Sequence, residues 1–142
     1  MQPVAFLDVR TGVLKALAQA FPNIDRFGEE IKEGLKPPCF FVKILEPTHT
    51  QELGRRYARE IPVDVHYFDE TNKDRITMAE QLTSLLETIQ VNGNPIRGIN
   101  VSWEIVDEVL HFFITYRMQV WKQKPSYPSM QTLDIEEALK NG

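Results

Sequence analysis

Four segments of this chain alternate apolar and polar side chains, and this alternation constrains the fold more than any other feature. They are residues 40–44, 61–67, 96–106 and 109–122. Successive side chains of a strand point to opposite faces of a sheet, so a period of two is typical of strands with one face on a core. Only Asp107 and Glu108 separate the last two segments, which predicts a tight antiparallel hairpin. The pattern therefore indicates a mainly antiparallel sheet.

Two other segments carry apolar residues at helical spacing and are expected to cover one face of this sheet. The first, residues 7–20, ends just before Phe21 and Pro22. The second follows Thr71, which forms a capping-box pattern with Asp74, and the turn residues 92–95 are expected to end it. Its predicted apolar stripe consists of Ile76, Ala79, Leu82, Leu85, Leu86 and Ile89.

The predicted class is α+β, in the order helix, short strand, two strands, helix, two strands and tail. The short strand is predicted within residues 24–31 and is expected at a sheet edge. A chain of 142 residues fits one domain, which we place at residues 1–124. Residues 125–142 are expected to form a C-terminal tail that docks on a neighbouring subunit, with a short helix at 133–140.

Composition excludes several classes of protein. Hydrophobic residues make up 42% and charged residues 25%, as in ordinary globular domains, and no run approaches the length of a membrane span. A net charge of −4 argues against a nucleic-acid binder, because binding phosphates requires a basic face. We do not expect the first twelve residues to be a secretory signal. The single cysteine, Cys39, begins an apolar run and is expected to be buried and inert.

The period of two also sorts the strand side chains between the two faces of the sheet. The face expected under the helices holds Phe40, Val42, Ile44, Ile61, Val63, Val65, Tyr67, Ile99, Val101, Trp103, Ile105, Leu110, Phe112, Ile114, Tyr116, Met118 and Val120. The other face holds polar residues together with Cys39, Phe41, Leu45, Phe68, Phe113 and Trp121. Aromatic residues on an outer face indicate that the first helix, the tail or a neighbouring subunit covers it, and the remaining alternative is that they are scattered there by chance. Cover by a neighbouring subunit predicts a homo-oligomer.

Few residues suggest chemistry. Asp64, His66 and His111 point to the same face, so they would form a metal or acid–base cluster if their strands were adjacent. No His-x-x-x-His pair or cysteine ligand supports such a cluster, and histidines on the polar face of a sheet are usually just solvated. Phosphate-binding loops and nucleophile motifs are also absent from the sequence. We therefore predict no catalytic, cofactor-binding or metal-binding residue, and no enzymatic activity.

One polar connection carries a local cluster of arginines, Arg55, Arg56 and Arg59, around Tyr57. It is interpreted either as a solvated hairpin neutralised by Glu52 and Glu60, or as a ribbon that docks onto a partner protein. In a ribbon, Arg55, Tyr57 and Arg59 would share one side and Arg56 would lie on the other. The candidate interface residues are Phe41, Leu45, Arg55, Arg56, Tyr57, Arg59, Phe68, Phe113 and Trp121.

Four phrases of the sequence, in this order, carry a resemblance to a known family. They are LKALAQAFP at 14–22, KPPCFFVKIL at 36–45, ELGRRYAREIPVDVHYF at 52–68 and EIVDEVLHFFITYRMQVWK at 104–122. The chain resembles the small tail terminator-like proteins encoded by phages and prophages of Gram-positive bacteria. The resemblance implies a mixed α/β fold and a non-enzymatic virion component, assembled in the cytoplasm of the bacterial host.

The resemblance also implies partners. Tail terminators form a hexameric ring that caps the tail tube, stops its growth and joins the head connector, so the expected partners are further copies of the chain, the tail tube protein and a head-completion protein. A free monomer in solution is compatible with a ring that forms only on the tube. Two alternatives stay open, namely a head-closure or neck protein, and a small-molecule or metal-binding α+β domain or enzyme.

Overall fold

The computed structural model describes residues 4–28 and 36–122, and in this range the α+β class is confirmed. The predicted tail, its short helix and the domain boundary at residue 124 lie outside the described residues. The elements are α1 (Phe6–Ala20), β1 (Asp25–Phe27), β2 (Cys39–Ile44), β3 (Thr48–Leu53), β4 (Arg56–Phe68), α2 (Asn72–Leu85), β5 (Thr88–Val91), β6 (Asn94–Val106) and β7 (Val109–Trp121). Neither of these two helices is long and apolar enough to cross a membrane.

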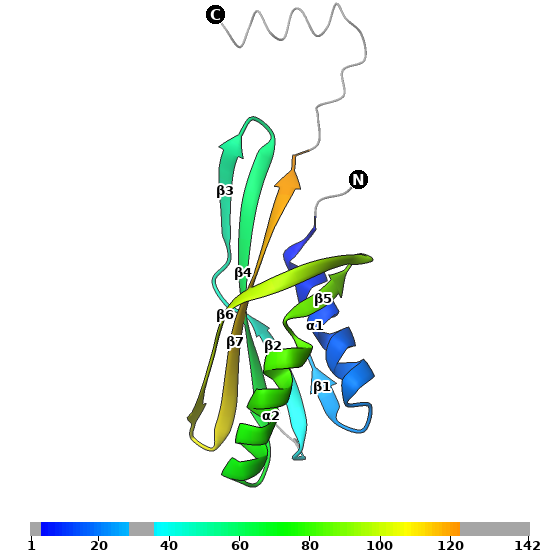
Figure 1. Ribbon diagram of the computed structural model, residues 1–142, viewed down its shortest axis with the longest axis vertical. Coiled ribbons are helices and arrows are strands. Elements are labelled where there is room, and N and C mark those ends of the chain that lie inside the picture. The colour runs from blue at the N-terminus through cyan, green and yellow to red at the C-terminus, as the bar shows by residue number, and fades with distance from the viewer. Residues whose placement is uncertain (1–3, 29–35, 123–142) are drawn as a thin grey trace, which may run out of the picture.

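The strands form one curled sheet in the order β1-β2-β4-β7-β6-β5, with β3 paired to part of β4 (Figure 1). Every pairing is antiparallel except that of β1 with β2. β1 lies at the sheet edge, as predicted, although it is shorter than the predicted strand, whose last residues lie outside the described range. β4 and β7 pair along their full lengths, from Arg56 opposite Trp121 to Phe68 opposite Val109. This long central pair is the frame on which the other elements pack.

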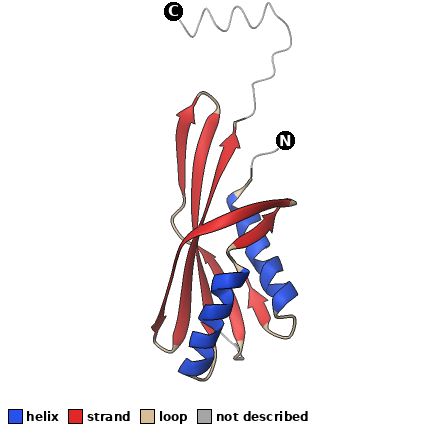
Figure 2. Ribbon diagram, in the orientation of Figure 1, coloured by secondary structure: helices blue, strands red, loops and turns tan. Residues whose placement is uncertain are grey.

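Both helices bury apolar residues in one core cluster, together with the predicted inner face of β2, β4 and β7. Figure 2 shows the helices beside the sheet, whereas the β3–β4 hairpin extends beyond them. The fully buried side chains of this core include Leu17, Phe40, Ile61, Leu82, Phe112 and Tyr116. The assignment of faces by alternation is therefore confirmed for the three central strands.

Helix α2 begins as predicted but turns a different face to the core. The Thr71 hydroxyl accepts a hydrogen bond from the Asp74 backbone N–H at 3.1 Å, which is the expected cap. Ile76, predicted on the buried stripe, is 49% exposed, and Arg75 is buried instead. Two nitrogens of its guanidinium donate, one to the Asp69 carbonyl at 2.6 Å and one to Asn72 Oδ1, whereas the buried Nε has no partner among the described residues.

Residues 88–91 form strand β5, so Ile89 is not helical as predicted. The turn Asn92-Gly93 does not end a helix but joins β5 to β6, and both residues have positive φ angles of 51° and 81°. The predicted tight hairpin between β6 and β7 is present, and Asp107 and Glu108 also have positive φ angles, 50° and 65°. Two consecutive positive φ angles are typical of the type I′ turns that suit the twist of paired strands.

Strand β6 departs from the predicted alternation. Ile99, Val101 and Trp103 were expected in the core, but they are 39%, 39% and 43% exposed. The pairing register with β7 shifts between Ile99 and Ser102, and Asn100 between them has a φ of 56°. This β-bulge reverses the alternation, so Ile99 lies opposite Thr115 on the outer face, whereas Trp103 stays opposite the core residue Phe112.

Candidate assembly surfaces

The β3–β4 hairpin projects from the domain (Figure 1), and the apolar Leu53 and the basic Arg55 at its tip are exposed. All six residues of β3 are exposed. Leu53 lies opposite Arg56, and Arg56 lies opposite Trp121 of β7. Leu53 is 74% exposed and Trp121 is 58% exposed. We call Leu53, Arg55, Arg56 and Trp121 the hairpin tip.

Leu53 was missed by the sequence analysis, because β3 lacks the apolar alternation that marks the other strands. The available signal was Gly54, a residue typical of turns, which directly follows Leu53 and has a φ of 58°. A turn at this position converts the predicted polar connection into two paired strands, a hairpin that both interpretations share, so docking onto a partner stays a prediction. Arg55 lies in this turn and is exposed.

Two of the candidate residues on this hairpin face intramolecular partners. Arg59 donates to the Val4 carbonyl at 2.7 Å and to His49 Nδ1 at 3.0 Å, and its guanidinium lies 4.4 Å from the centre of the Phe6 ring. Tyr57 stacks on His49, with ring centres 4.5 Å apart. These contacts join β3 and β4 to the start of α1, so they give Arg59 and Tyr57 a role in holding the hairpin.

The acidic residues expected to neutralise the hairpin do form ion pairs. Glu52 Oε1 lies 3.4 Å from Arg56 Nε, as the solvated-hairpin interpretation predicted. Glu60 instead pairs with Arg117 of β7, with 3.6 Å between Oε1 and Nε. Arg56 is thus partly neutralised within the hairpin, and such exposed pairs contribute little to folding stability.

A second exposed surface lies along β6. Strand β5 pairs only with residues 94–97 of β6, and no strand among the described residues pairs with the rest of β6 on the side away from β7. This stretch, residues 99–106, pairs with β7 on one side only and is called the β6 edge. Its exposed apolar side chains are Ile99, Val101, Trp103 and Val106. An unpaired strand that exposes apolar residues is suited to binding another chain.

The outer face of the sheet, opposite the helices, carries the remaining candidates. Phe41, Leu45, Phe68 and Phe113 are all half-buried there. The expectation that the first helix covers this face is wrong, because the buried residues of α1 pack in the core cluster on the other face. The alternatives that remain are the tail, which lies outside the described residues, and a neighbouring subunit.

The cysteine on this face is buried, as predicted, with 1% of its surface exposed. Burial, together with the nearby charge of Asp25, raises the pKa of the Cys39 thiol. A raised pKa keeps the thiol protonated, and a protonated thiol is a poor nucleophile and metal ligand. The prediction of an inert cysteine is consistent with this environment.

The outer face also brings together Asp64, His66 and His111, as the sequence suggested for adjacent strands. Asp64 Oδ2 lies 2.9 Å from His66 Nε2 and 3.0 Å from His111 Nδ1. Within the described part of the chain, this is the one cluster of histidine, cysteine or acidic side chains whose ligand atoms could hold a metal ion.

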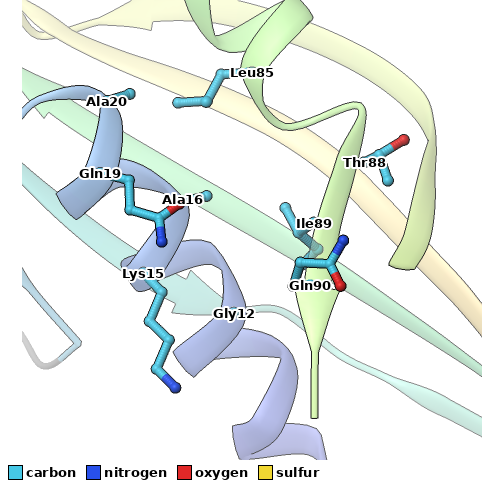
Figure 3. A pocket seen from close by; sticks show the side chains of 9 residues that line it. All are labelled: Gly12, Lys15, Ala16, Gln19, Ala20, Leu85, Thr88, Ile89 and Gln90. Carbon is cyan, nitrogen blue, oxygen red and sulfur yellow. The ribbon is translucent and has the colours of Figure 1, made fainter. Parts of the chain in front are cut away.

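A pocket of about 360 Å³ lies between α1 and β5 (Figure 3). Lys15 and Gln19 of α1 line one side, and Ile89 and Gln90 of β5 line the other. The only ionisable side chain in its lining is Lys15, so the pocket offers no acid–base pair. The lining of this pocket therefore gives no support to the enzyme alternative.

Comparison with known proteins assigns the chain to a family. No curated protein is significantly similar to it. One solved structure aligns with 86% of this chain and 99% of its own at 15% identity, with a TM-score of 0.40, a similarity too low to carry an argument. A family model described as phage tail terminator protein matches residues 8–128, from the first turn of α1 to beyond the end of β7. The chain therefore belongs to the phage tail terminator family, whose members are structural components of the virion that act in tail assembly.

Proposed function

We propose that this protein ends the growth of the phage tail by closing as a hexameric ring on the tip of the tail tube. The ring prevents further tube subunits from adding and presents its opposite side to a head-completion protein. Family membership supports the tail assembly role. The observation that carries the ring is the β6 edge, a stretch that pairs with β7 on one side only and has four exposed apolar side chains.

We propose that neighbouring subunits of the ring contact each other through this edge, and we call this the lateral contact. A ring requires a heterologous contact, in which two different surfaces of the subunit meet. The β6 edge supplies one surface, through its free backbone groups and through Trp103 and its apolar neighbours. The half-buried aromatic residues of the outer face, Phe41, Phe68 and Phe113, supply the other.

The axial contact with the tail tube protein is placed at the hairpin tip. This part of the molecule extends beyond the helices and exposes Leu53 and Trp121 beside Arg55. Large apolar side chains combined with arginine are typical of the residues that dominate binding at protein interfaces. The ring assembles in the host cytoplasm, where tails are built, and remains in the virion.

The lateral contact is tested with a matched pair of variants on β6. Trp103→Ser removes an exposed apolar side chain from the edge, whereas Glu104→Ser alters its exposed polar neighbour. Each variant is supplied to a phage or prophage that lacks the gene, and tails are examined by electron microscopy. Trp103→Ser is expected to give tails of uncontrolled length, and Glu104→Ser to give normal tails. Uniform tails with both variants would contradict the lateral contact.

The axial contact is tested with Arg55→Glu, which reverses a charge at the exposed turn without removing a described side-chain contact. The variant is expected to keep the ring but to bind purified tail tube protein more weakly. Lys73→Glu, a charge reversal on an exposed residue of α2, is the control. Binding of the wild-type protein to portal or connector protein, but not to tube protein, would favour the head-closure alternative.

A further inference from the structure

Three side chains from the two central strands meet on the outer face of the sheet. Asp64 and His66 are two residues apart on β4 and therefore point to the same side. His111 of β7 lies directly opposite His66 in the register. The carboxylate of Asp64 lies between the two imidazoles, and the ring centres of the histidines are 4.3 Å apart. Full pairing of β4 with β7 fixes the backbone of all three residues.

The burial of this cluster is unusual for an outer face. Asp64 is only 5% exposed, although no described helix lies over it. Its second carboxylate oxygen, Oδ1, is buried and has no hydrogen-bond partner among the described residues. A buried carboxylate oxygen without a partner is costly in a folded protein, and a cation bound by both oxygens of the carboxylate would satisfy it.

The surroundings of the cluster are aromatic. The Phe41 ring meets His66 edge-on with 5.1 Å between ring centres, and Phe113 stacks beside His111 at 6.3 Å. The side chains of His66 and His111 are 17% and 22% exposed, so only a small part of each imidazole contacts solvent. A polar centre within an apolar wall strengthens electrostatic attraction, because little water screens it.

We propose that Asp64, His66 and His111 form a binding site for a divalent transition-metal ion of the zinc type. Their ligand atoms all lie within 4.8 Å of one another. Asp64 Oδ2 is 2.9 and 3.0 Å from the two imidazole nitrogens. Metal–ligand bonds of roughly 2.0–2.2 Å hold the ligand atoms of a tetrahedral zinc ion about 3.3–3.6 Å apart, so the three atoms need to separate by only about 0.5 Å to bind the ion. Two imidazoles and one carboxylate are a common ligand set for such ions, and the remaining positions are left to water.

The proposal goes beyond the role in tail assembly and uses none of the residues of the hairpin tip or the β6 edge. It also differs from the prediction of a metal-free protein. The competing interpretation is a hydrogen-bonded cluster, in which both imidazoles only donate N–H groups to Asp64. The two interpretations differ in one measurable property, the uptake of a metal ion by the free chain.

The test uses the full-length protein, freed of metal with a chelator, and titrates it with ZnCl₂ by calorimetry. One ion per chain is expected, with a rise in melting temperature. His111→Gln is expected to lower the affinity by more than the roughly 10–100-fold that follows loss of an outer-shell partner. His49→Gln is the matched control, because His49 is the remaining histidine of the chain and lies on the hairpin. It is expected to bind zinc as the wild-type protein does.

A second measurement needs no variant and so does not depend on whether His111→Gln folds. Proton–nitrogen correlation spectra of the wild-type imidazoles are recorded with and without zinc. Shifts of the His66 and His111 nitrogens, with His49 unchanged, would support the site. Absence of saturable binding at one ion per chain, or equal perturbation of all three histidines, would overturn it. Both measurements are made on the isolated protein. Their results therefore do not depend on whether the protein forms a ring.

Discussion

The two faces of the sheet bury their side chains by different means. On the helix-covered face, apolar residues such as Phe112 and Ile114 pack beneath α1 and α2 and are fully enclosed. On the outer face, the adjacent residues His111 and Phe113 are only half-buried, and they surround a buried carboxylate. The same strand, β7, supplies both sets through its alternation.

The two faces are therefore expected to have different roles, one in folding and the other in binding. Burial of apolar surface is the main favourable contribution to folding, and the helix-covered face supplies most of it. The outer face carries side chains on which no described helix packs, including the polar cluster and three phenylalanines. We therefore expect changes on the covered face to act on stability, and changes on the outer face to act on binding.

The largest expected effect compares two neighbouring residues of β7. Phe112→Ala removes a ring that is fully buried, and we expect a loss of about 3–5 kcal/mol in unfolding free energy. Phe113→Ala removes the same side chain from the half-buried outer position, and we expect about 1 kcal/mol. Urea unfolding, followed by circular dichroism, measures both. Equal losses would mean that the outer face belongs to the folding core.

The next largest effect concerns the contact between α1 and β5. A Cβ atom added at Gly12 would lie 2.8 Å from the Gln90 carbonyl oxygen and 3.1 Å from Val91 Cγ2. Alanine favours a helix over glycine by about 1 kcal/mol, but this backbone contact cannot move aside, so we expect Gly12→Ala to cost about 1–3 kcal/mol overall. Thr11→Ala, at the exposed neighbouring position, is the control and should be nearly neutral. A stabilised Gly12→Ala protein would show that α1 does not approach β5 this closely.

A smaller effect is expected from one buried hydroxyl on the covered face. Tyr116 donates to the Leu86 carbonyl at 2.7 Å, just beyond the end of α2. Tyr116→Phe leaves this carbonyl without its partner and is expected to cost about 1–2 kcal/mol. Tyr57→Phe on the hairpin, where the ring is only half-buried, serves as the control. Identical urea midpoints for the wild-type protein and Tyr116→Phe would argue against the bond.

The same hydroxyl predicts a dependence on alkaline pH. Burial raises the pKa of Tyr116 above its ordinary value of 10.0, so the folded state holds this proton more tightly than the unfolded state. The stabilisation is complete below about pH 10, where both states are protonated, and it is lost progressively as the pH rises above that value. Stability measured from about pH 8 to pH 11 should fall less steeply in Tyr116→Phe. Parallel curves would contradict the raised pKa.

Alternation along the sequence predicted the faces of β2, β4 and β7, because a strand with neighbours on both sides keeps a regular pleat. Alternation failed on β6, because the bulge around Asn100 shifts the inward and outward positions of this strand by one residue. Asparagine tolerates the positive φ angle of the bulge but does not require it, so the sequence does not reveal the bulge. The buried face of α2 also differs from the predicted one. Hydrophobicity favoured Ile76, whereas hydrogen bonds from the Arg75 guanidinium made the arginine the better buried residue.

The candidate sites show the same limit. The sequence placed Asp64, His66 and His111 on one face but could not show that β4 and β7 are neighbours, and this pairing is what brings the three together. The β6 edge was not predicted, because its apolar residues looked like core residues until the sheet order was known. Alternation reports which face a side chain points to, whereas pairing and coverage depend on contacts between distant segments.

The smallest expected effect on folding is that of Trp121→Ser at the hairpin tip. The indole is 58% exposed and lies at the end of β7, beyond the helices, so the free energy of unfolding should change by no more than about 0.5 kcal/mol. Its effect on binding to purified tail tube protein is expected to be large, because exposed tryptophan next to arginine is typical of binding hot spots. Gln119→Ser, two residues earlier on the same side of β7, removes a hydrogen bond to Glu52 but no apolar surface, and this control should bind normally. A tryptophan variant that folds and binds like the wild-type protein would remove the hairpin tip from the axial contact and leave the β6 edge as the remaining assembly surface to test.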